Sequence, residues 1–189
     1  FIDSTSRTWE YHPELNNLFI RTAIYPTGSP NAADYYIAVN GENSVGPGCG
    51  YNELIINVFD PISFKPMMNT ASGLYGSYNC QNMAYNREYN FHFYMGDTAT
   101  RRMAREFLEN IVPNGAYVAI RSNTSPEITP YPPNTYASVW QADEAQYGTG
   151  NTIYHYLKNQ GFTSIDQYNS ALAFAFVYKK NSLATYTPS

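Results

Sequence analysis

The chain has 189 residues, of which 43% are hydrophobic, 16% aromatic and only 14% charged, with a formal net charge of -4. This composition excludes a disordered chain, which would be rich in charge, and a long helical rod, which would need abundant Ala, Glu, Lys and Leu. The acidic balance argues against a nucleic-acid binder that works through a basic face. We expect one domain, residues 1–189, with a sizeable core.

The sequence predicts an extracellular protein, either secreted or attached to the cell surface. Its polar residues are rich in Tyr, Asn, Ser and Thr and poor in Lys and Glu, a balance commoner outside the cell than in the cytosol. No apolar run approaches the roughly 18 residues that a membrane-spanning helix needs. The chain starts at Phe1 without a signal-peptide pattern, so we expect a segment excised from a longer multidomain protein.

In the first half of the chain, apolar runs bounded by Pro, Gly and Asn predict strands after a lead-in segment, residues 1–16. These strands are expected over residues 18–25, 35–39, 54–59 and 89–94. Asn40-Gly41 predicts a tight turn after the second strand, because both residues tolerate positive φ. Three glycines between residues 46 and 50 precede a strand and no helix, so they indicate a tight turn rather than a phosphate-binding loop.

The second half predicts two helices, each followed by a strand. Asp97 is the expected N-cap of a helix with one apolar stripe, and a strand over residues 116–120 follows it. Asn151 is the expected cap of the second helix, which Gly161 closes. The run over residues 171–179 is apolar on both faces, which predicts a strand in the centre of its sheet. The order β-β-β-β-α-β-α-β indicates an α+β fold.

Cys49 and Cys80 could form one disulfide in an extracellular chain, or they could be two buried thiols. Neither belongs to a Cys-x-x-Cys pair, and the three histidines, His12, His92 and His155, have no ligand spacing. The sequence therefore predicts no metal site, and we expect no cofactor.

No catalytic motif stands out, so the sequence does not indicate an enzyme. The Gly-x-Ser-x-Gly elbow of serine hydrolases is absent, and no local signature surrounds Cys49 as a nucleophile for His92 or His155. A pair of carboxylates that converge only in the folded protein stays open as the basis of a hydrolase. The candidates are Asp60, Asp97, Asp143, Glu144 and Asp166.

Residues 121–149 predict a long Pro-rich loop that carries a group of aromatic residues. Loops of this length are usually functional or locally folded. Aromatic rings with nearby polar groups suit the apolar face and hydroxyl rim of a sugar. The candidate ligand-binding residues are Trp140, Tyr136, Asp143, Tyr147, Tyr94 and Arg121. The alternative for Trp140 is that its ring anchors the loop in the core.

Several segments together resemble the interleukin-like EMT inducer domain, also called the PANDER-like domain. The similarity covers residues 35–181. It rests on GCGYN at 48–52 with LIINVFDP at 54–61, FLENIVPNG at 107–115 with YVAI at 117–120, YLKNQG at 156–161, and FAFVYKK at 174–180.

This resemblance implies a non-catalytic domain of two mostly antiparallel β-sheets packed with two α-helices, of the kind found in multidomain bacterial surface proteins. The family includes secreted signalling proteins and a glycan-binding stem domain of a glycosyltransferase. We therefore expect a lectin-like, carbohydrate-binding domain. The alternatives are a structural or adhesive module that binds neighbouring surface proteins, and a hydrolase with an unrecognised site.

Overall fold

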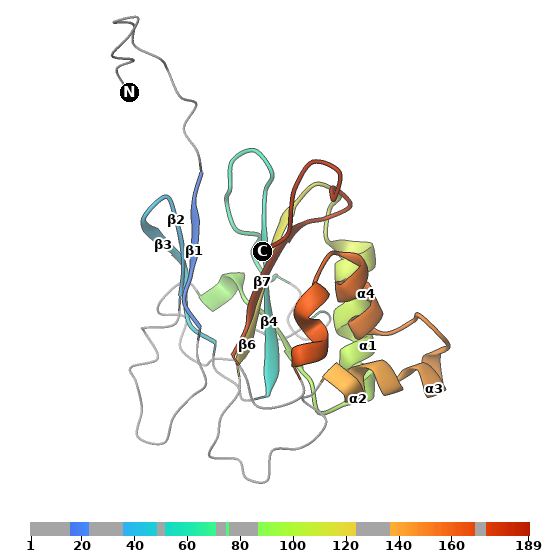
Figure 1. Cartoon of the computed structure of the whole chain (residues 1–189). Helices are drawn as coiled ribbons and strands as arrows, with labels where there is room; N and C mark the ends of the chain where they lie inside the picture. Colours follow the sequence, from blue (N-terminus) through green and yellow to red (C-terminus); the bar gives the residue numbers. More distant parts are fainter. Residues whose placement is uncertain are drawn as a thin grey trace, which may run out of the picture.

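The computed structural model describes residues 16–22, 36–48, 52–70, 75, 87–123, 137–168 and 173–189. These residues form two antiparallel β-sheets and a group of short helices (Figure 1). The general α+β class predicted from the order of elements is confirmed. The predicted disulfide between Cys49 and Cys80 lies outside the described residues.

The larger sheet has four strands in the order β5-β4-β6-β7. Ile56 in the central strand β4 lies opposite Phe91 on one side and opposite Ile120 on the other. Successive side chains in a strand point to opposite faces, so each strand supplies residues to both sides of this sheet. The strands are β4 (Glu53–Phe59), β5 (Phe91–Tyr94), β6 (Tyr117–Asn123) and β7 (Ala175–Lys179).

Strand β7 lies at the edge of this sheet, and the prediction that it is central was wrong. Its apolar residues are nevertheless covered on both faces: Phe176 and Tyr178 are buried on one face, and Val177 packs against a second cluster on the other. The C-terminal segment covers its outer backbone, because Val177 and Ser189 exchange two backbone hydrogen bonds of 2.7 and 3.0 Å. A strand that is apolar on both faces therefore indicated burial and not a central position.

The smaller sheet has three strands in the order β1-β2-β3. The predicted turn at Asn40-Gly41 is confirmed, since both residues have positive φ, 54° and 84°, and join β2 to β3. The sequence analysis missed β3, whose ENSV sequence has little apolar signal. The strands are β1 (Leu18–Ile20), β2 (Ile37–Val39) and β3 (Glu42–Val45).

The α-helices gather on one side of the larger sheet (Figure 1). As predicted, Asp97 caps α1: its Oδ1 accepts hydrogen bonds from the amides of Ala99 and Thr100. The second predicted helix is capped by Thr152, one residue after the expected Asn151, and Gly161 follows it with a φ of 95°. The helices are α1 (Thr98–Glu106), which continues into the π-helical turn η3 (Phe107–Ile111), α2 (Ala137–Ala142), α3 (Glu144–Tyr147) and α4 (Ile153–Asn159).

The larger sheet is the middle layer between the helices and the smaller sheet (Figure 1). Leu54, Ile56 and Val58 of β4 point into the larger core beneath the helices. Phe59 points the other way, into a smaller core that contains Ile37 and Val45 of the smaller sheet. The chain thus builds two cores that share one sheet.

The predicted loop over residues 121–149 is partly regular structure. Strand β6 continues to Asn123, and α2 and α3 occupy residues 137–142 and 144–147. Residues 124–136 lie outside the described residues. Short helices of four to six residues have too few turns to show a clear apolar stripe in the sequence, which is why they were missed.

Candidate functional site

A pocket of about 230 Å³ opens where the smaller sheet meets the face of the larger sheet that points away from the helices. Phe59, Tyr117 and Lys179 lie directly opposite one another across β4, β6 and β7, so they form one row on this face. The pocket is lined by Asn16, Leu18, Phe59, Phe64, Tyr117, Val177, Tyr186 and Ser189.

Aromatic rings make up much of this pocket. Phe59 is fully buried at its base, whereas Phe64, Tyr117 and Tyr186 are half-buried. The Phe64 ring stacks on Tyr117 with 4.9 Å between ring centroids, and Tyr186 meets Tyr117 edge-on at 5.4 Å. Burial raises the pKa of the Tyr186 phenol further above neutral pH, where any tyrosine hydroxyl is protonated and can donate a hydrogen bond. The pocket therefore combines flat apolar faces with hydroxyl groups.

The turn after β4 holds Phe64 in place. Asp60 Oδ1 accepts hydrogen bonds from the amides of Ile62 and Ser63 and from the Ser63 hydroxyl. These bonds stabilise the carboxylate and lower the pKa of Asp60. The turn leaves Phe64 with a φ of 55°, a left-handed conformation that costs a bulky residue about 1–2 kcal/mol. The surrounding bonds keep the ring against Tyr117 despite that cost.

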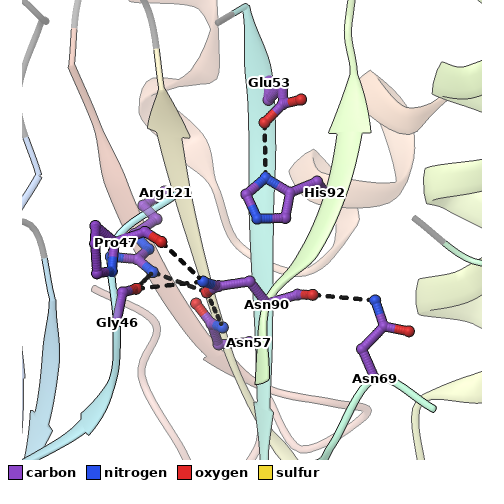
Figure 2. A network of polar contacts seen from close by, with 8 residues as sticks. All are labelled: Gly46, Pro47, Glu53, Asn57, Asn69, Asn90, His92 and Arg121. Atoms are coloured by element: carbon purple, nitrogen blue, oxygen red, sulfur yellow. Dashed lines mark hydrogen bonds and ion pairs between the residues drawn. The ribbon is translucent and has the colours of Figure 1, made fainter. Parts of the chain in front are cut away.

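A buried polar network lies on the same face of the larger sheet (Figure 2). Asn90 Nδ2 donates to the carbonyl groups of Gly46 and Pro47, while its Oδ1 accepts from Asn57 Nδ2 and from Arg121 Nη2, both at 2.9 Å. Arg121 Nη2 also donates to the Gly46 carbonyl at 2.6 Å. Burial lowers the pKa of Arg121 to about 9. The network holds the segment after β3 against the sheet.

His92 and Glu53 form a second polar contact beside this network, with 2.7 Å between His92 Nδ1 and Glu53 Oε2 (Figure 2). His92 is only 6% exposed, and its Nε2 has no hydrogen-bond partner among the described residues. Gly48 packs closely over this ring: a Cβ on Gly48 would lie 3.2 Å from His92 Cε1 and would clash with Ile55 Cδ1. A side chain at this position would therefore force the end of the Ile55 side chain to move.

The residues predicted to bind a ligand do not form one site. Trp140 is fully buried and its ring contacts Tyr168, so it has no exposed face for stacking and belongs to the core. Arg121 is also buried, on the opposite face of the sheet from Trp140. Tyr94 is 46% exposed on β5. Tyr136 lies outside the described residues.

Asp143 and Tyr147 lie in the helical layer. Asp143 receives two hydrogen bonds of 2.7 Å from the Arg101 guanidinium and a third from Thr98, so it joins α1 to the start of α3. Tyr147 lies beside the Arg102 guanidinium, 5.0 Å from its ring centroid. Asp143 is therefore occupied by a buried ion pair rather than available to a ligand.

Tyr147 also borders an open groove of about 430 Å³ between α1 and α3. Its charged side chains pair with each other within the helix: Arg102 with Glu106 at 2.7 Å, and Arg105 with Glu109 at 3.0 Å. Ion pairs with i, i+4 spacing are common on solvent-exposed helix surfaces. Among the described residues, the groove has one aromatic ring, Tyr147, which the Arg102 guanidinium covers, and its charges are paired, so the pocket at the sheets is the better candidate.

The pocket residues Phe64, Tyr117 and Tyr186 were not predicted from the sequence. They lie in or after predicted strands, where aromatic residues are usually part of the core. Among the carboxylates proposed for catalysis, Asp60 is occupied by its own turn, Asp97 by the α1 cap and Asp143 by Arg101. Within the described ranges, no three His, Cys, Asp or Glu side chains are grouped to hold a metal ion.

The chain matches no family model, no curated protein and no solved structure in the comparisons made. None of the described helices is long and apolar enough to cross a bilayer. The geometry of the pocket therefore carries the functional argument.

Proposed function

We propose that this protein is a non-catalytic extracellular binding domain that takes a carbohydrate in the aromatic pocket between its two sheets. The observation that carries the proposal is the set of rings from Phe64, Tyr117 and Tyr186 around a pocket of about 230 Å³. A sugar ring has an apolar face that stacks on aromatic rings and hydroxyl groups that bind polar neighbours.

The polar groups at the pocket support the same ligand class. Asn16 and Ser189 are exposed at its lining, and the Tyr186 phenol can both donate and accept. A few polar groups beside an apolar surface are typical of sites that bind neutral, hydroxyl-rich molecules. The histidine of the buried network has little access to solvent, which supports a structural role for that network and a non-catalytic domain.

The test is calorimetric titration of the wild-type protein and a Tyr186→Ala variant against a panel of simple sugars and polysaccharides. We expect the substitution to weaken binding roughly three- to tenfold, because it removes one stacking ring. Tyr186→Phe keeps the ring and should keep most of the affinity. Tyr186 is half-buried, so both variants should fold.

Tyr94→Ala is the matched control, because this tyrosine is exposed on β5 and does not line the pocket. It should leave affinity unchanged. If Tyr94→Ala abolishes binding while Tyr186→Ala does not, the ligand binds elsewhere. If the wild-type protein binds no carbohydrate at all, the proposed function is wrong.

A further inference from the structure

Lys179 lies at the edge of the pocket and makes no ion pair with a carboxylate in the described part of the chain. Lys179 lies directly opposite Tyr117 in the sheet, and its Nζ is 5.0 Å from the centroid of the Tyr117 ring. Within the described part of the chain, this ring is the partner found for the Lys179 ammonium. A cation over an aromatic face is attracted by the ring but keeps its charge and its hydrogen-bond donors.

Three other cations of the described residues form ion pairs with carboxylates. Arg101 pairs with Asp143, Arg102 with Glu106, and Lys158 with Asp166 at 2.8 Å. Lys179 differs from these residues because its charged group contacts an aromatic ring, whereas theirs contact carboxylates.

Asp60, in the turn after β4, makes no ion pair with Lys179, because its Oδ1 accepts hydrogen bonds from the amides and hydroxyl of its own turn. An ammonium beside an aromatic ring interacts with an anion more strongly than one surrounded by water, because the ring excludes water from one side and lowers the local dielectric constant.

We propose that the pocket selects an anionic sugar, with a uronate carboxylate on the Lys179 ammonium while the sugar ring stacks on the aromatic residues. This inference rests on the proposed function and names its ligand class. Lys179 is the specificity-determining residue: the rings bind any sugar face, and the ammonium distinguishes an acidic sugar from its neutral counterpart. The overall acidity of the chain does not oppose this, since screening confines such interactions to about 8–10 Å at physiological salt.

The test compares two ligands that differ only in charge: an oligogalacturonate and the same oligomer with its carboxyl groups methyl-esterified. Wild-type protein should bind the acid at least tenfold more tightly at 50 mM NaCl, as expected for one charge-assisted hydrogen bond. This preference should shrink at 500 mM NaCl. A sulfated galactose oligomer forms a third arm, which separates recognition of a carboxylate from recognition of any anion.

Lys179→Met keeps an apolar stem against Tyr117 and removes the charge. It should lose the preference for the acid, so that the acid and the esterified oligomer bind this variant with similar affinity. Lys158→Met is the control, because it makes the same change in net charge on α4, in the helical layer on the other side of the larger sheet. This control should retain the preference.

Three outcomes separate the two proposals. Equal binding of acid and ester by the wild type, with no effect of Lys179→Met, overturns the anionic preference and leaves carbohydrate binding standing. Tighter binding of the sulfated oligomer than of the uronate overturns the assignment to a carboxylate. Binding of none of the three oligomers, together with no binding across the wider sugar panel, overturns the proposed function itself.

Discussion

Tyr178 shows how burial changes the chemistry of one side chain. It is fully buried in the larger core, and its hydroxyl donates to the Tyr156 hydroxyl at 3.5 Å. Burial disfavours the phenolate and raises the pKa of Tyr178 well above its usual value of 10.0. The pKa of Tyr156 is raised for the same reason.

This pKa shift predicts a loss of stability in alkali. Between pH 10 and its raised folded-state pKa, Tyr178 keeps its proton in the folded protein and loses it in the unfolded chain. The free energy of unfolding therefore falls as pH rises through this window, by on the order of 1 kcal/mol per pH unit for one group, and the contribution is complete below pH 10. Urea unfolding at pH 8, 10 and 11 should show a steeper loss for the wild type than for Tyr178→Phe. Parallel curves for the two proteins would contradict this account.

At the scale of elements, the Arg101–Asp143 pair joins α1 to the short helices that follow β6. The side chains are 5% and 10% exposed, and Arg101 Nη1 also donates to the Met95 carbonyl at 2.7 Å. A buried pair of this kind contributes little compared with apolar packing, but removal of one partner leaves an uncompensated charge. The pair therefore contributes mainly by fixing the positions of α2 and α3 relative to α1.

Asp143→Ala should lower the free energy of unfolding by about 3–5 kcal/mol, because it leaves the Arg101 guanidinium buried without its carboxylate. The double variant Arg101→Met with Asp143→Leu should be clearly more stable than the single variant. Chemical denaturation of the three proteins measures both effects. The single variant should still bind carbohydrate under conditions where it is folded, which distinguishes a structural Asp143 from the ligand-binding role predicted from the sequence.

At the scale of the whole molecule, the larger sheet couples two cores on its opposite faces. Leu108 is fully buried in the core beneath the helices, and Ile37 is fully buried between the sheets. The central strands β4 and β6 supply residues to both cores, so loss of one core exposes a face of the strands that hold the other. We therefore expect the described layers to unfold together.

Leu108→Ala should cost about 2–5 kcal/mol, and Ile37→Val about 0.5–1.5 kcal/mol. The two residues lie on opposite sides of a sheet, so the double variant should lose the sum to within about 0.5 kcal/mol. Each variant should show one transition that is the same by circular dichroism and by tyrosine fluorescence. Two separate transitions would mean that the smaller sheet folds independently of the larger one.

The sequence by itself determined the local features of this protein. The turn at Asn40-Gly41, the cap at Asp97 and the helix end at Gly161 were all predicted, because each depends on the conformational preference or hydrogen bonding of one or two residues. Strands with strong apolar runs, such as β4, were predicted for a similar reason. The α+β class followed from the order of these elements.

Only the tertiary structure decided where the candidate site lies. Phe59, Tyr117 and Lys179 are separated by about 60 residues each in the sequence, and strand register alone brings them into one row. Tertiary packing also decides the position of Trp140. The short helix α2 directs its ring into the core, although its sequence context suggested a loop. Aromatic residues that build a core and those that line a pocket are chemically identical, so only the packing of the sheets distinguishes them.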